Sequence, residues 1–250
     1  MRLEQTIIDR YNQDGIPGHR KKLQYIQSEI PESEAIIERL IRFQVAIPSW
    51  ALGTGGTRFA RFPRGGEPRN LEEKLEDIGL LHALNRSGGA VSLHIPWDIP
   101  SDPSRVRNMA AELGLRFDAM NSNTFQDQPE QPLSYKFGSL QHTDRNVRKQ
   151  AIDHNLEVIQ YGIELGSESL TVWLADGSCF PGQLNFRKAF QRTLAGLEEI
   201  YAALPEKWKM FVEYKAFEPN FYSTTVGDWG QSLLYTSKLG PKAFTLVDLG

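Results

Sequence analysis

The chain has 250 residues, a net charge of -3 at pH 7, and contents of 40% hydrophobic and 24% charged residues. This is an ordinary globular balance, which excludes the disordered and fibrous classes. A chain of this length can bury a sizeable core without disulfides or metal ions. Lys and Arg total 28 against 31 Asp and Glu, so there is no basic excess to neutralise a phosphate backbone. The composition therefore argues against a nucleic-acid partner.

The cysteine content and the apolar runs of the sequence predict the cellular compartment of the protein. Cys179 is the single cysteine, so the sequence cannot build a disulfide framework. The first residues, MRLEQTIIDRYNQ, lack the continuous apolar run of a signal peptide. No stretch approaches the roughly 18–20 apolar residues of a membrane span. These features predict a cytoplasmic protein with no membrane partner.

Apolar periodicity divides the chain into an N-terminal helical segment, 1–42, and an alternating α/β part, 43–250. The first segment has helical spacing over residues 2–12 and 31–42. The strands we expect after it are 43–47, 90–95, 115–120, 169–174, 209–214 and 243–249. The helices we expect between them are 69–85, 103–113, 144–165, 184–203 and 228–239. Strands that alternate with long helices predict parallel pairing in βαβ units.

The number of strands bears on the architecture. A length near 250 residues suits a complete eight-stranded barrel, yet the pattern yields six strands. The last of them, TLVDLG, is an apolar parallel strand that needs a neighbour and cover on both faces. We therefore expect residues 1–250 to form a single, incomplete (β/α)8 TIM-barrel domain that lacks its last two βα units. An open six-stranded α/β sheet is the alternative.

Five consecutive strands end in polar or aromatic residues. In chain order these are His94 and Asp98, Asn121 and Asn123, Trp173 and Asp176, Glu213 and Lys215, and Asp248. Chemistry in α/β barrels is located at the carboxyl ends of the strands, where successive loops meet. We therefore expect these residues to gather at one site.

Glu213 and Lys215 form the most suggestive pair. They are two residues apart on one strand, so both side chains point to the same face. Glu213 and Asp248 would supply two hard oxygen ligands for Mg²⁺ or Mn²⁺, and Lys215 would stabilise an enolate-like oxygen. An ordinary Glu–Lys ion pair is the alternative.

Other candidates have simpler alternatives as well. His94 could bind a substrate hydroxyl or act as an acid or base, or it could be a hydrogen-bonded core histidine. Trp173 could offer a flat wall to a sugar, or simply pack. The glycine-rich loop 53–56 lacks the ending of a phosphate-binding loop, and the aromatic and basic residues 58–62 after it suggest a lid or an intersubunit contact. His-x-x-x-His and Cys-x-x-Cys spacings are absent, so zinc-motif chemistry is not indicated.

Six strings together resemble the L-rhamnose isomerase family of Pseudomonas and related bacteria: IPSWALGTGGTRFARFP, VSLHIPWD, GLRFDAMNSNTF, LTVWLADGSCFPGQ, FVEYKAFEPNFYST and GPKAFTLVDLG. The resemblance runs from about residue 40 to the end of the chain. It implies a metal-dependent aldose–ketose isomerase on a xylose-isomerase-like (β/α)8 barrel, usually a homotetramer. It also implies a divalent cofactor, with Mn²⁺ first and Mg²⁺, Co²⁺ or Zn²⁺ as alternatives.

The resemblance assigns roles to individual residues. It implies that Glu213 and Asp248 bind a structural metal, that Lys215 lies near the carbonyl end of the sugar, that His94 and Trp173 contact the substrate, and that Phe59 closes the site of a neighbouring subunit. His94 and Lys215 are the residues we expect to be catalytic.

The reaction implied is the interconversion of L-rhamnose and L-rhamnulose. The family continues past LVDLG with further His and Asp ligands that this sequence does not contain, so we expect the 250-residue chain to be inactive alone. Two alternatives are another divalent-metal barrel enzyme, such as a sugar epimerase or phosphodiesterase, and a non-catalytic barrel fragment.

Overall fold

The structure is a computed structural model that describes residues 4–53, 65–174, 184–214 and 226–249. Three helices come first: α1 (Gln5–Asn12), α2 (Ile16–Glu29) and α3 (Ser33–Arg42). The strands that follow are β1 (Ala46–Pro48), β2 (Ala90–Ile95), β3 (Arg116–Thr124), β4 (Ser169–Leu174), β5 (Lys209–Glu213) and β6 (Ala243–Leu246). Between them lie the short 3-10 helix η1 (Ser49–Ala51) and helices α4 (Leu71–Asn85), α5 (Pro103–Glu112), α6 (Arg145–Leu165), α7 (Phe186–Ala202) and α8 (Trp229–Leu239).

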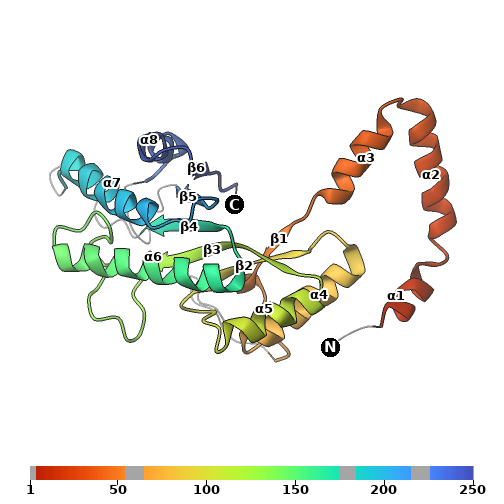
Figure 1. The fold of residues 1–250 in the computed structure, drawn as a ribbon, viewed down its shortest axis with the longest axis horizontal. Helices are drawn as coiled ribbons and strands as arrows, with labels where there is room; N and C mark the ends of the chain where they lie inside the picture. The colour runs from red at the N-terminus through yellow and green to blue at the C-terminus, as the bar shows by residue number, and fades with distance from the viewer. Residues whose placement is uncertain (1–3, 54–64, 175–183, 215–225, 250) are drawn as a thin grey trace.

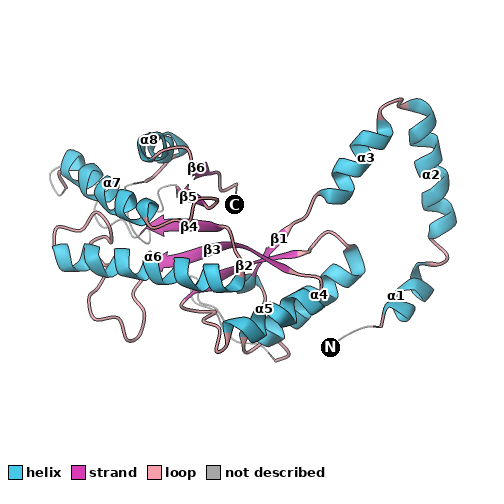
Figure 2. Cartoon of the chain, in the orientation of Figure 1, coloured by secondary structure: helices cyan, strands magenta, loops and turns pink. Residues whose placement is uncertain are grey.

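The six strands form one parallel sheet in sequential order, β1-β2-β3-β4-β5-β6. Helices α4 to α8 follow the strands and lie along the sheet (Figure 1, Figure 2). The predicted α/β class and parallel pairing are confirmed. In a parallel sheet with this order every strand has its carboxyl end at the same edge, so residues that follow the strands come together.

Each of the five helices α4 to α8 begins after a capping Asn or Asp. The caps are Asn70, Asp102, Asp144, Asn185 and Asp228, whose side-chain oxygens accept hydrogen bonds from backbone N–H groups in the first turn. Such a cap satisfies a donor that the helix itself cannot pair. At its other end α6 stops at Gly166, whose φ of +84° is a conformation that glycine adopts without a Cβ clash.

The two faces of the sheet have different compositions. On β2, Val91, Leu93 and Ile95 are fully buried in the hydrophobic core. The alternating residues Ser92 and His94 border a cavity on the opposite face. The same alternation recurs on β4 and β5, as the pleat of a strand requires. The apolar core therefore lies between the sheet and the helices, and the inner face is left for a site.

The N-terminal helices form an arm that reaches away from the sheet (Figure 1). Helix α1 returns beside α4, where Ile8 is buried and the side chains of Gln5 and Arg86 are hydrogen-bonded. Helix α2 was not distinguished by the sequence pattern, which indicated helices only over 2–12 and 31–42. Among the described residues, no helix combines the length and apolarity that crossing a bilayer requires.

The predicted limits of three strands were wrong, and a fourth, over 209–214, ends one residue earlier, at Glu213. The first strand is Ala46–Pro48 rather than 43–47, because Phe43 ends α3 and its side chain is exposed. The sixth strand ends at Leu246 rather than 249, since its pairing with β5 stops at Glu213–Leu246. The third extends to Thr124, beyond the predicted 120, and continues to pair with β4. The strands over 90–95 and 169–174 are confirmed.

Candidate active site

A cavity of about 920 Å³ opens on the inner face of the sheet. Residues from all six strands or the segments directly after them line it. Five of the residues predicted to gather at one site are among them: His94, Asn121, Trp173, Glu213 and Asp248. The parallel sheet therefore brings together side chains that are up to 154 positions apart in the chain, from residue 94 to residue 248.

Aromatic rings form one wall of the cavity. The His94 ring stacks on Trp97 at a centroid distance of 4.1 Å and meets Trp50 and Phe125 edge-on at 5.4 and 5.5 Å. Phe125 in turn lies 4.1 Å from Trp173. All five rings line the cavity. They belong to β1 through β4 or to the residues just after those strands, so one side of the cavity is largely apolar.

His94 is buried, and this determines its protonation state. Burial lowers the pKa of its imidazole to about 3, and electrostatic interactions with His154 and Lys74 act in the same direction. The ring is therefore neutral at pH 7. Its Nδ1 atom is buried without a hydrogen-bond partner among the described residues. A buried polar atom facing a cavity costs free energy unless a ligand or water pairs with it.

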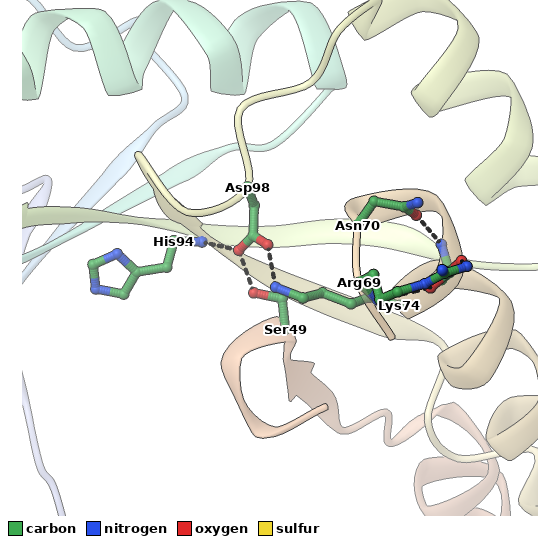
Figure 3. Close-up of polar contacts among 7 residues, drawn as sticks. Ser49, Arg69, Asn70, Lys74, His94 and Asp98 are labelled. Atoms are coloured by element: carbon green, nitrogen blue, oxygen red, sulfur yellow. Dashed lines mark hydrogen bonds and ion pairs between the residues drawn. The ribbon is translucent and has the colours of Figure 1, made fainter. Parts of the chain in front are cut away.

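Asp98 fixes the backbone that carries His94 (Figure 3). Its carboxylate accepts hydrogen bonds from the backbone N–H of His94 at 2.9 Å and from the Ser49 hydroxyl at 2.5 Å. The other carboxylate oxygen lies 2.7 Å from the ammonium of Lys74, and both side chains of this ion pair are buried. The network joins β2, η1 and α4, so it holds the start of the aromatic wall to the helical layer.

Two carboxylates line the same cavity from β5 and the segment after β6, away from the aromatic wall. Glu213 ends β5, Asp248 follows β6, and both are half-buried and line the cavity. The Tyr214 hydroxyl donates to the backbone carbonyl of Asp248 at 3.1 Å, which ties the segment after β6 to β5. Carboxylate oxygens are suitable ligands for Mg²⁺ or Mn²⁺, so the ligand type that this pair offers fits a divalent ion. Within the described ranges no cluster of three or more His, Cys, Asp or Glu side chains is present.

Other predicted residues lie elsewhere. Phe59, Asp176 and Lys215 fall outside the described residues. Asp98 does not line the cavity, contrary to expectation, because its carboxylate is turned into the ion pair with Lys74. Asn123 is likewise absent from the lining; it is buried, and its backbone N–H donates to His154 on α6 at 3.1 Å.

Sequence reasoning missed most of the aromatic wall. Trp50, Trp97 and Phe125 lie just after β1, β2 and β3 respectively. His94 and Trp173 were selected because they lie at the carboxyl ends of predicted strands. The same criterion, extended to aromatic residues just beyond each strand, would have selected these three as well. Lys74 gave no comparable signal, because a lysine within a predicted surface helix is ordinarily exposed.

Comparisons with known proteins point to sugar isomerases, although no protein-family model matches the chain. The chain is 58% identical over 217 residues to a Rhizobium meliloti protein named probable sugar isomerase, and 56% identical over 217 residues to a protein of the same name from Mesorhizobium japonicum. Each match covers 87% of this chain and 50% of the relative. The chain thus spans about half the length of the curated relatives it matches. It is also 27% identical over 194 residues to xylose isomerase of Thermus thermophilus, covering 71% of this chain and 47% of that protein.

Solved structures identify the fold. An L-ribulose 3-epimerase superimposes with a TM-score of 0.56 at 16% identity, over 81% of this chain and 59% of the other. A D-allulose 3-epimerase from Methylomonas sp. gives 0.58 at 14% identity, over 82% and 62%. The α/β fold is therefore that of the xylose-isomerase-like TIM barrels, and the described residues supply six of its parallel strands.

Proposed function

We propose that this chain carries the sugar-binding part of a divalent-metal aldose–ketose isomerase whose substrate pair is L-rhamnose and L-rhamnulose. The observation that carries the proposal is the division of one cavity into an aromatic wall and a carboxylate pair. The names of the relatives that match most of this chain support the reaction class. The resemblance of the six sequence strings supports the choice of L-rhamnose.

The aromatic wall suits the apolar side of a sugar. Trp173, Phe125 and Trp97 line the cavity, and aromatic rings are surfaces against which the C–H groups of an open-chain or ring sugar pack. Binding sites of this kind combine apolar walls with a few polar groups that fix orientation. Asn121, whose amide donates to two backbone carbonyls and also lines the cavity, is held rigidly by those bonds.

The proposed role of His94 is to orient a hydroxyl group of the sugar. Because its pKa is about 3, the imidazole stays uncharged at pH 7 and exchanges a hydrogen bond rather than forming an ion pair. The buried Nδ1 is the atom available for that bond. Asp98 and Trp97 position the residue from its backbone and its ring face, which limits the directions in which the ring can point.

Glu213 and Asp248 are the residues we propose as metal ligands. A divalent ion, Mn²⁺ in our proposal, supplies charge that polarises a sugar carbonyl. Lys215, two positions after Glu213 in the sequence, is proposed to stabilise the oxygen on which negative charge develops. Phe59 is proposed to close the site of a neighbouring copy in a homotetramer.

Intrinsic fluorescence tests the sugar site, because Trp50, Trp97 and Trp173 line the cavity. We expect a saturable change when L-rhamnose is added in the presence of Mn²⁺, and a much smaller one in Trp173→Phe. Trp229→Phe serves as the control, since Trp229 is exposed on α8. Absence of saturable binding of any aldose or ketose would refute the proposal. Tighter binding of L-ribulose or D-allulose than of L-rhamnose would favour an epimerase instead.

A further inference from the structure

A second cavity, of about 570 Å³, lies between α6 and α7. Five of its lining side chains are cationic, Arg145, Arg148, Lys149, Lys188 and Arg192, against one carboxylate, Glu199. The whole chain carries a net charge of -3, so this concentration of positive charge is local. The groove shares no lining residue with the cavity on the inner face of the sheet.

Two of the arginines are held beside each other despite their like charge. Arg148 donates from Nη1 to the backbone carbonyls of His142 and Thr143, at 2.7 and 3.0 Å. Arg192 donates from Nε to the backbone carbonyl of Gln141 at 2.6 Å. Burial lowers the pKa of Arg192, and the charge of Arg148 lowers it further. Consecutive carbonyls of one loop therefore fix two mutually repelling guanidinium groups.

The charge of this pair is not neutralised by the parts of the chain that the structure describes. Lys149 is paired with Asp153, but no described carboxylate lies within ion-pair distance of Arg145, Arg148, Lys188 or Arg192. The carbonyl bonds leave Nη2 and Nε of Arg148, and both Nη atoms of Arg192, without a described partner. A planar guanidinium group with free N–H donors binds a tetrahedral oxyanion through two hydrogen bonds at once.

We propose that this groove binds a small phosphomonoester dianion through Arg148 and Arg192, with Lys188 and Arg145 at its margin. A dianion relieves the repulsion between the two guanidinium groups more fully than a monocarboxylate does. A small ligand is favoured over a nucleic-acid strand because these five cationic side chains line one groove of about 570 Å³ on a chain whose net charge is -3. This site is separate from the proposed sugar site and does not depend on it.

Isothermal titration with inorganic phosphate and with ribose 5-phosphate tests the groove at low ionic strength. We expect saturable binding that weakens about tenfold or more in the Arg148→Met/Arg192→Met variant, because two charge-assisted bonds are lost. The matched control is Arg20→Met/Arg39→Met, which removes the same charge from the exposed faces of α2 and α3. Circular dichroism establishes that each variant is folded, and the single variants Arg148→Gln and Arg192→Gln replace the double variant if it is not.

Three outcomes would overturn the proposal. The first is the absence of phosphate binding to the unmodified chain. The second is an equal loss of affinity in the groove variant and its control, which indicates attraction by overall charge alone. The third is tighter binding of a single-stranded oligonucleotide than of ribose 5-phosphate through the same arginines, which indicates a polymeric ligand.

Discussion

The ammonium nitrogen of Lys74 lies 2.7 Å from a carboxylate oxygen of Asp98, and neither side chain is appreciably exposed to solvent. The two residues come from α4 and from the loop after β2. Since Asp98 also accepts hydrogen bonds from Ser49 and from the backbone of His94, the lysine neutralises a charge on which the geometry of the site depends.

Replacing this lysine should therefore be costly. Lys74→Met keeps most of the side-chain volume but leaves the Asp98 carboxylate buried and unpaired, and we expect the free energy of unfolding to fall by about 3–5 kcal/mol. Urea denaturation measures the loss. Arg69→Met, which breaks the exposed ion pair with Glu73, should leave the unfolding midpoint unchanged. Similar midpoints for the two variants would show that the buried pair is not important for stability.

Stability should fall as the solution is acidified through the titration range of His94. Its pKa is about 3 in the folded chain and 6.5 in its ordinary state, so between these values the unfolded chain binds a proton that the folded chain does not. Linkage then requires stability to be complete above about pH 6.5 and to decrease towards pH 3, by up to about 1.4 kcal/mol per pH unit. Thermal unfolding measured across this range tests the expectation.

His94→Phe separates this effect from general acid denaturation, because it retains an aromatic ring but has no ionisable group. Its unfolding temperature should depend less steeply on pH between 3 and 6.5 than that of the unmodified chain. His19→Gln, which removes a histidine from the exposed surface of α2, is the control for the loss of an imidazole. An unaltered slope in His94→Phe would contradict the assignment.

Two helical glycines should respond in opposite directions to the same substitution. A Cβ at Gly162 on α6 would lie 2.4 Å from the Trp208 ring and 2.8 Å from Met120, so Gly162→Ala should destabilise the chain by about 1–3 kcal/mol. A Cβ at Gly18 on α2 meets nothing within 4 Å, and Gly18→Ala should stabilise α2 by about 0.5–1 kcal/mol. Denaturation curves for the pair provide the comparison; the same sign for both would be inconsistent with the close contact at α6.

Affinity for Mn²⁺ should depend on the carboxylates of the cavity. Glu213→Gln and Asp248→Asn each remove a charge from the proposed ligand pair, and we expect each to weaken Mn²⁺ binding roughly tenfold or more, since affinity follows the charge of the ligands. The electron paramagnetic resonance signal of free Mn²⁺ measures binding directly. Glu206→Gln, on the surface after α7, is the control. Unchanged affinity in both variants would remove these residues from the metal site.

The sequence predicted most of the barrel part of the fold because its signals are local. Apolar periodicity predicted helices that overlap α4 to α8, and the predicted limits of β2 and β4 are confirmed. The first strand was placed too early because Phe43 continues an apolar run that in fact belongs to the end of α3. Helix α2 has no buried residue to impose a periodic pattern, so its sequence carried little signal.

The candidate site could be predicted only where position along a strand determined position in space. His94, Trp173, Glu213 and Asp248 share the cavity because parallel strands align their carboxyl ends. Lys74 and Asp98 could not be paired in advance, since their contact depends on how α4 packs against β2. The direction taken by the Asp98 side chain likewise depends on the Ser49 hydroxyl, which lies 49 residues away in the chain.

The sequential order of the six strands also bears on how the chain is synthesised. Each strand pairs with the one made just before it, so no strand has to wait for a distant segment before it finds a neighbour. Sheet growth can therefore follow translation, one βα unit at a time as the chain emerges from the ribosome. The growing edge at each stage is a single strand, and the next strand to be made pairs with it.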